Sequence, residues 1–128
     1  MSQPDMSELN AFVDRYIAVW HEPDAEFRRQ SVASLWAEDG GYANEVSECR
    51  GHAAIEAVVT RAHEEFVGKG YVFKSSKAVG HHNVVRMYWD MVPASGGEVE
   101  AAGFDFFILG DDGRIRYDYQ FTDKLPSF

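Results

Sequence analysis

The sequence predicts an α+β domain in which three helices precede a mostly antiparallel sheet. Apolar residues recur at three- and four-residue spacing as far as Phe66, and from Tyr71 onward they alternate with polar residues. An Asp-Gly pair at Asp112-Gly113 separates two β-rich runs, a pattern typical of a hairpin. Helices followed by strands favour a sheet that carries its helices on one side.

The composition indicates one folded domain, taken as 1–128. The chain has 128 residues, of which 45% are hydrophobic and 14% aromatic, so we expect an aromatic-rich interior. The net charge of −9 repels phosphate backbones and anionic lipids, so neither nucleic acid nor a membrane is an expected partner. The first ten residues lack signal-peptide features, and the single Cys49 suits a reducing compartment, so we expect a cytoplasmic location.

Two helices are expected in the first third of the chain. Apolar residues at helical spacing predict the first over 8–20. Asp24 opens a second helical stretch, which runs through Trp36 and which we expect Gly40-Gly41 to close.

An extended piece over 41–46 leads to the third helix, which begins at Gly51 and stops before 68–70. Strands are predicted over 84–91 and 99–109. The inward face of the first of these strands consists of Val85, Met87, Trp89 and Met91.

Asp105 is the most informative residue for function, because it is a lone carboxylate within an apolar strand. An ionised carboxylate in such a place is costly. The group must reach solvent at a cavity mouth, find hydrogen-bond donors, or stay protonated through a raised pKa. All three outcomes suit a ligand pocket better than a plain core.

Four short motifs carry a family resemblance. They are Arg15-Tyr-Ile-Ala-Val-Trp20, Ala37-Glu-Asp39, Arg50-Gly-His52 before a helix, and Asp112-Gly-Arg-Ile115. With these motifs the chain resembles the nuclear transport factor 2-like superfamily, and more narrowly the SnoaL-like domain proteins, over about 8–122. The resemblance implies a cystatin-like, conical α+β barrel, in which a strongly curved sheet wraps around three N-terminal helices and leaves a deep pocket. It also implies a homodimer.

The catalytic pattern of the superfamily's ketosteroid isomerases is only partly present. On that pattern Tyr16 falls at the tyrosine, and Asp105 falls at the protonated acid that donates to an oxyanion. The general base falls at Asn44, and an amide cannot take up a substrate proton at neutral pH. The isomerase pattern is therefore incomplete.

Two other enzyme patterns of the superfamily are also incomplete. Tyr42-Ala43-Asn44 reproduces the Tyr-x-Asn part of limonene epoxide hydrolases, and Gln120 falls at their final aspartate. The Arg-Asp part is missing, because strand alternation turns Arg86 and Asp90 away from the cavity. The polyketide cyclases carry a His-rich strand where this chain has Ala101-Ala102-Gly103.

On this fold, one pocket gathers residues from distant parts of the sequence. Asp105 and Tyr16 are the candidate catalytic residues, placed to donate to a carbonyl or enolate oxygen. The apolar alternation of the last strand sends Gln120 outward, whereas the family register sends it inward. The candidate substrate-binding residues are Trp20, Tyr42, Asn44, Met87, Trp89 and Gln120. The apolar set of the last strand is Ile115, Tyr117, Tyr119 and Phe121.

The same residues have purely structural interpretations. Asp105 is equally consistent with a buried carboxyl that Tyr16 and a backbone group satisfy. Tyr16 and Trp20 are core residues by default, because aromatic residues on an amphipathic helix face the interior. The histidines lack metal-ligand spacing and are interpreted as surface or capping residues, so no metal or cofactor is expected.

The function favoured by the sequence is the binding of a small hydrophobic molecule. If the protein is an enzyme, we expect a cofactor-free isomerase, dehydratase or cyclase that acts on a carbonyl compound. The alternative is a non-catalytic module that binds a metabolite, or that binds a partner protein through the outer face of the sheet.

Overall fold

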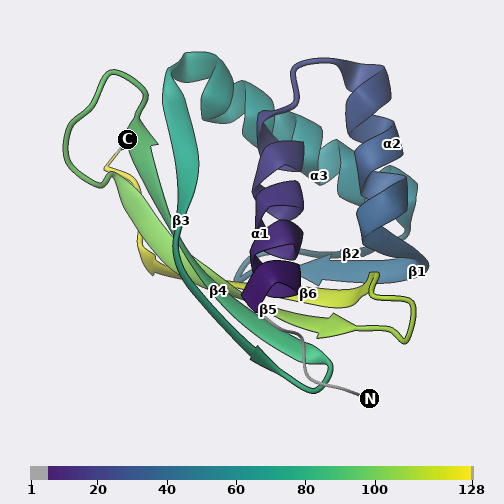
Figure 1. Ribbon diagram of the computed structural model, residues 1–128. Helices are drawn as coiled ribbons and strands as arrows, with labels where there is room; N and C mark the ends of the chain where they lie inside the picture. The colour runs from purple at the N-terminus through teal and green to yellow at the C-terminus, as the bar shows by residue number, and fades with distance from the viewer. Residues whose placement is uncertain (1–5, 128) are drawn as a thin grey trace.

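The computed structural model describes residues 6–127, and Figure 1 labels the elements along the chain. The helices are α1 (Met6–His21), α2 (Ala25–Leu35) and α3 (His52–Glu65), and the short 3-10 helix η1 (Val67–Lys69) follows α3. The strands are β1 (Trp36–Ala43), β2 (Glu48–Arg50), β3 (Tyr71–His81), β4 (Val84–Pro93), β5 (Ala101–Leu109) and β6 (Ile115–Lys124). The predicted α+β class is confirmed.

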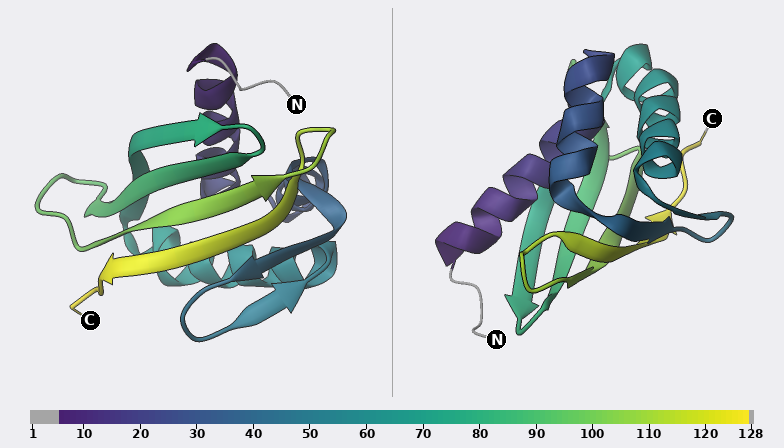
Figure 2. Two further views of the ribbon diagram at one scale, coloured as in Figure 1. Left: turned by 90° about the horizontal axis from the view of Figure 1, so that it is seen from below. Right: turned by 90° about the vertical axis from the view of Figure 1, so that its right-hand side faces the viewer.

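The six strands form one curved sheet in the order β2-β1-β6-β5-β4-β3. Only the β1–β6 pairing within this sheet is parallel. The helices cover the concave face, as the two views of Figure 2 show. The sheet does not close, because β2 and β3 form its two edges. The architecture is therefore an open cone rather than a barrel.

No helix within residues 6–127 combines the length and apolar character of a membrane span.

Helix α1 supplies the centre of the core. Its buried side chains follow the predicted helical spacing, and the ring of Phe12 meets that of Phe107 edge to face at 5.1 Å. At its end, His21 Nε2 accepts a hydrogen bond of 3.0 Å from the backbone N–H of Phe73. Helix α1 is thereby joined to the edge strand β3.

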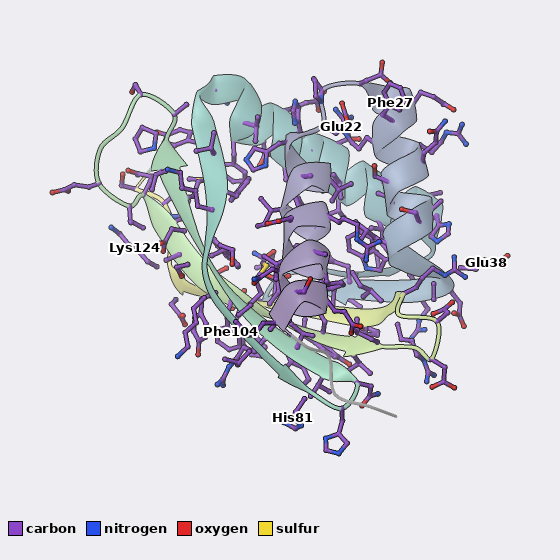
Figure 3. All side chains as sticks on the ribbon, viewed as in Figure 1. Glu22, Phe27, Glu38, His81, Phe104 and Lys124 are labelled. Atoms are coloured by element: carbon purple, nitrogen blue, oxygen red, sulfur yellow. The ribbon has the colours of Figure 1, made fainter. Side chains whose placement is uncertain are left out.

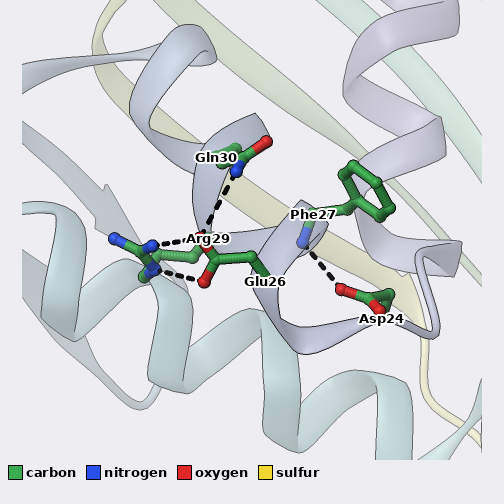
Figure 4. A network of polar contacts seen from close by, with 5 residues as sticks. All are labelled: Asp24, Glu26, Phe27, Arg29 and Gln30. Carbon is green, nitrogen blue, oxygen red and sulfur yellow. Dashed lines mark hydrogen bonds and ion pairs between the residues drawn. The ribbon is translucent and has the colours of Figure 1, made fainter.

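Helix α2 ends earlier than predicted. It begins at the N-cap Asp24, whose carboxylate accepts from the N–H of Phe27, as Figure 4 shows. It ends at Leu35, and Gly40 and Gly41 lie inside β1 instead of closing the helix. The glycines permit close strand packing, because a Cβ at Gly40 would lie 2.8 Å from the carbonyl oxygen of Ile115. The prediction of a helix through Trp36 was wrong.

Helix α3 begins after Gly51, as predicted. Gly51 has a φ of 89°, and Gly70, which follows η1, has a φ of 97°. Both angles favour glycine, which explains why the chain turns at these two positions. Ile55 and Val59 are the buried residues of the helix.

Strands β4 and β5 pair without a register shift, so their side chains alternate between the inward and outward faces as predicted. Strand β6 differs. Ile108 pairs with Tyr117 and Leu109 with Ile115, so β6 has one extra residue at this point. This bulge reverses the phase of the side chains that follow. Of the two registers left open for this strand, the apolar alternation therefore fails beyond Tyr117 and the family register holds, since Tyr119 is 38% exposed while Asp118 is fully buried.

Candidate functional site

Two adjoining hollows lie between the sheet and the helices. The outer one has a volume of about 420 Å³, and the inner one, of about 50 Å³, lies against Tyr16 and Asp105. The side chains that line both hollows are those of Trp20, Phe73, Trp89 and Gln120. The two hollows therefore adjoin along these four side chains, and we call them together the pocket, with the larger as its mouth and the smaller as its base.

The fold brings all eight candidate residues of the sequence analysis to this pocket. Tyr16, Met87 and Asp105 line the inner hollow, and Tyr42 and Asn44 line the outer one. Trp20, Trp89 and Gln120 line both. Gln120 faces inward because the bulge in β6 places it opposite Asp105, its pairing partner on β5.

The base of the pocket contains two carboxyl groups joined by one hydroxyl. Tyr16 Oη lies 2.9 Å from Asp105 Oδ2 and 2.6 Å from Asp118 Oδ2. All three side chains are buried, with relative exposures of 3%, 2% and 0%. Tyr16 has a single hydroxyl proton, so it can donate to only one carboxyl and must accept from the other. At least one aspartate therefore carries a proton.

Asp118 is the aspartate that carries the proton. Within residues 6–127 its buried Oδ1 atom has no hydrogen-bond partner, an arrangement too costly for an ionised carboxylate. Burial raises the pKa of Asp118 well above its ordinary value, and the neighbouring Asp105 raises it further. The hydrogen bonds therefore run from the Asp118 carboxyl to Tyr16, and from Tyr16 to Asp105.

Asp105 is the member of the pair that faces the pocket. Burial, the largest effect, raises its pKa, while the neighbouring Asp118 and the hydrogen bond from Tyr16 oppose this effect. Trp89 also lowers the pKa of Asp105, although its indole Nε1 atom completes no hydrogen bond of ordinary geometry. The Asp105 carboxyl therefore lines the pocket with a pKa that burial raises above its ordinary value.

The role expected of Tyr16 needs correction. From the sequence we expected its hydroxyl to donate to a ligand oxygen, but both of its hydrogen bonds are made with carboxyl groups. Burial, followed by Asp105 and Asp118, raises the pKa of Tyr16 well above 10.0. The tyrosine is thus a neutral link that orients Asp105.

The sequence left open whether Asp118 faces the pocket, and Asp118 was not among the candidate site residues, because strict alternation from Ile115 sends it to solvent. One signal was available: Asp118 is a lone carboxylate in a β-rich run, just as Asp105 is. A bulge cannot be located from the sequence, because the extra residue is defined only by the pairing with β5.

Two polar residues at the mouth are held by the protein itself. Tyr42 donates its hydroxyl hydrogen to Gln120 Oε1. Asn44 Oδ1 accepts from the N–H groups of Val46 and Ser47, which closes the turn between β1 and β2. The position that corresponds to an isomerase base therefore has a structural task here.

Trp20 and Trp89 form the shared wall of the two hollows. Each is 8% exposed, and among residues 6–127 the indole Nε1 atom of each is buried without a hydrogen bond of ordinary geometry, although that of Trp89 lies near enough to Asp105 to lower its pKa. Buried N–H groups normally have partners, so these two donors call for an explanation.

The histidines are divided between surface and interior. His81 and His82 are exposed at the β3–β4 hairpin, as predicted. His21, His52 and His63 are half-buried instead, and each lies within hydrogen-bonding distance of a backbone carbonyl. Within residues 6–127, no group of three or more His, Cys, Asp or Glu residues is arranged to hold a metal ion.

The chain belongs to the family that this fold and pocket indicate. The family model of the SnoaL-like domain matches residues 13–117, so the protein is a member of the SnoaL-like family. The resemblance stated from the sequence is confirmed. None of the curated proteins matches the chain.

Solved structures support the same assignment. A SnoaL-like family protein from Agrobacterium tumefaciens, named as a candidate isomerase, shares 32% identity, with a TM-score of 0.83 over 92% of this chain and 99% of that one. A candidate polyketide cyclase from Sinorhizobium meliloti is 16% identical, with a TM-score of 0.69 over 91% and 99% of the chains. A candidate ketosteroid isomerase from Kribbella flavida is 16% identical, with a TM-score of 0.66 over 92% and 79%. The last two similarities concern the fold alone.

Proposed function

We propose that this protein binds a small hydrophobic carbonyl compound and catalyses a cofactor-free proton transfer on it, as an isomerase, dehydratase or cyclase does. The observation that carries the proposal is the buried group Asp105–Tyr16–Asp118, which reaches the pocket through Asp105. Its pKa-raising environment is the kind in which enzymes keep acids and bases. The similarity to the candidate isomerase from Agrobacterium tumefaciens supports the same class of reaction.

The chemical step follows from the two carboxyl groups. Ionised Asp105 takes a proton from the carbon next to the carbonyl group, whose electrons move onto the carbonyl oxygen to form an enolate. The resulting neutral Asp105 returns the proton to another atom of the same molecule. Asp118 keeps its own proton throughout and, through Tyr16, stabilises the charge on Asp105. The reaction is neither an oxidation nor a reduction of the ligand.

The test is deuterium exchange into 2-tetralone, a bicyclic ketone with acidic protons beside its carbonyl group. Proton NMR in D2O measures the loss of these protons with and without the protein. We expect exchange faster than in buffer, reduced at least tenfold in Asp105→Asn and unchanged in Asp111→Asn, which alters an exposed turn residue. Equal rates in the wild type and in Asp105→Asn would refute the proton-transfer proposal.

A second function, binding without turnover, is favoured by the dimensions of the pocket. The outer hollow of about 420 Å³ accommodates a small molecule, whereas the inner one of about 50 Å³ admits a single small group. A protein of this kind would be stabilised against heat by 2-tetralone without exchanging its protons.

The outer face of the sheet carries the proposed homodimer interface. Phe121 is 45% exposed and stacks on Phe104, with the ring centroids 4.6 Å apart, and Phe104 also contacts the ring of Tyr88. Exposed aromatic residues in a cluster are typical of protein interfaces. A cytoplasmic location belongs to the same proposal and is supported by the unpaired Cys49.

A further inference from the structure

Gln120 presents an unused hydrogen-bond donor to the pocket. Its side chain lines both hollows, and its Nε2 atom has no hydrogen-bond partner within residues 6–127. The indole Nε1 atoms of Trp20 and Trp89 also lack partners of ordinary geometry, but both are fully buried, whereas Nε2 of Gln120 is not. The accessible donor of the wall shared by the two hollows is therefore the amide of Gln120.

The orientation of this amide follows from hydrogen bonds that begin at the turn between β1 and β2. Backbone N–H groups can only donate, so the Asn44 atom that accepts from Val46 and Ser47, at 3.0 and 2.9 Å, is the oxygen Oδ1. The free end of the Asn44 amide is therefore its nitrogen, Nδ2. Burial raises the pKa of Tyr42 well above its ordinary value, and Asn44 opposes this effect, as a donor to the hydroxyl oxygen does.

The hydroxyl of Tyr42 passes this orientation on to Gln120. A hydroxyl that accepts from Asn44 keeps its own hydrogen for a second partner, and Tyr42 donates that hydrogen to Gln120 Oε1. The oxygen end of the Gln120 amide is thus held at Tyr42, and the hydrogens on Nε2 remain for a ligand. Because these N–H groups can only donate, the ligand atom that they bind must be an acceptor.

Gln120 and Asp105 lie directly opposite each other. They are pairing partners in the antiparallel ladder between β5 and β6, and both side chains line the inner hollow. The Cβ atoms of such a pair are about 5 Å apart. In a ketone, one carbon atom separates the oxygen from the carbon that loses its proton. The pair therefore suits a ligand whose oxygen lies at Gln120 and whose reacting carbon lies at Asp105.

We propose that Gln120 Nε2 donates a hydrogen bond to the carbonyl oxygen of the ligand and to the enolate that forms from it, and that the ligand is a compact ketone or enone with an otherwise apolar body. This inference rests on the proposed function in one respect, namely that the ligand is a carbonyl compound. From the sequence this task was expected of Tyr16, whose hydroxyl is occupied by two carboxyl groups. A fixed donor directed at the oxygen on which charge develops stabilises the enolate.

The first experiment titrates the full chain with 2-tetralone and, separately, with tetralin, which has the same carbon skeleton without the oxygen. The chain has three glutamines, and Gln120→Met assigns the side-chain N–H signals of Gln120 in a ¹⁵N-resolved proton spectrum. We expect 2-tetralone to move one of these signals downfield of its position with tetralin, which reproduces the effect of the aromatic ring alone. Gln30 on α2 donates to Glu26 (Figure 4), so its signals should be the same with both ligands.

The second experiment measures the ratio of 2-tetralone affinity to tetralin affinity. Gln120→Met should lower this ratio about tenfold, the effect of one lost hydrogen bond. Tyr42→Phe keeps Gln120 but lets its amide turn, so the competent orientation becomes only part of the population and the ratio should fall about threefold. Gln30→Met, the same substitution at an exposed position of α2, is the matched control and should leave the ratio unchanged.

Three outcomes would overturn the inference: no binding of 2-tetralone, Gln120 signals at the same positions with both ligands, or an affinity ratio that Gln120→Met does not change. An unchanged ratio in Tyr42→Phe would overturn the orientation assigned to the amide.

The result is distinguishable from that of the proton-transfer test. If 2-tetralone binds through Gln120 but its protons do not exchange, the donor stands and the proposed catalysis fails. If the protons exchange as fast in Gln120→Met as in the wild type, the donor fails and the catalysis stands.

Discussion

Tyr16 Oη and Asp118 Oδ2 lie 2.6 Å apart, although 102 positions of the chain separate the two residues. This contact joins the middle of α1 to β6 beneath the pocket. Because Asp105 shares the same hydroxyl, the protonation of two carboxyl groups is coupled to the packing of the first helix on the sheet.

The first prediction concerns the pH dependence of stability. The pKa of Asp118 is raised in the folded protein, so the folded chain holds a proton that the unfolded chain releases above about pH 4. The free energy of unfolding therefore falls as the pH rises from about 4 through the pKa that Asp118 has in the folded protein. Asp118→Asn has no such proton, so its stability relative to the wild type should increase from pH 5 to pH 8 by at least about 1 kcal/mol.

Urea unfolding at several pH values measures this difference. Asp111→Asn, in the exposed turn before β6, is the control, and its stability relative to the wild type should be the same at both pH values. A constant difference between Asp118→Asn and the wild type across this range would show that Asp118 is ionised in the folded protein.

The second prediction concerns the hydroxyl that links the carboxyl groups. Tyr16→Phe removes the partner of both aspartates and should cost about 2 kcal/mol of unfolding free energy. Because the hydrogen bond from Tyr16 lowers the pKa of Asp105, the variant should also raise that pKa, as followed by carboxyl ¹³C NMR. Tyr88→Phe, on the outer face of the sheet, is the matched control. An equal loss of unfolding free energy in the two variants would contradict the role of the Tyr16 hydroxyl as the link between the carboxyl groups.

The third prediction concerns Gly103, beside the pocket wall. A Cβ at this position would lie 2.0 Å from the carbonyl oxygen of Phe121 and 2.8 Å from Cζ2 of Trp89. Gly103→Ala should therefore push β5 and β6 apart and cost about 3 kcal/mol in a denaturant titration. Gly68→Ala, whose Cβ would approach nothing closer than 3.4 Å, should change stability far less. Comparable losses would remove the steric explanation.

The fourth prediction concerns the homodimer. Phe121→Asp places a charge in the exposed aromatic cluster of the sheet and should convert a dimer into a folded monomer at micromolar concentration, as measured by light scattering after gel filtration. Phe27→Asp, at the 59% exposed Phe27 on α2, should leave the dimer intact. Figure 3 shows Phe27 and Phe104 at opposite sides of the molecule. A monomeric wild type, or dissociation by both variants, would eliminate the proposed interface.

Local sequence patterns were sufficient to predict which side chains face inward wherever neighbouring strands pair without a register shift. Period-two alternation placed Met87 and Trp89 on one face of β4, and Asp105 follows from the same rule, because β4 and β5 pair without a shift. The start of α3 was equally predictable, since Gly51 adopts a positive φ just before the helix.

The sequence by itself determined the order of helices and strands, the inward side of β4 and β5, and the presence of an acid among apolar residues. Only the tertiary structure decided that Gly40 and Gly41 continue a strand, that one extra residue in β6 turns Asp118 and Gln120 inward, and that Tyr16 joins two carboxyl groups. The physical reason is that strand phase depends on the neighbouring strand. A bulge is defined by the residues that lie opposite it on the paired strand, and the local sequence of one strand does not show which residues those are.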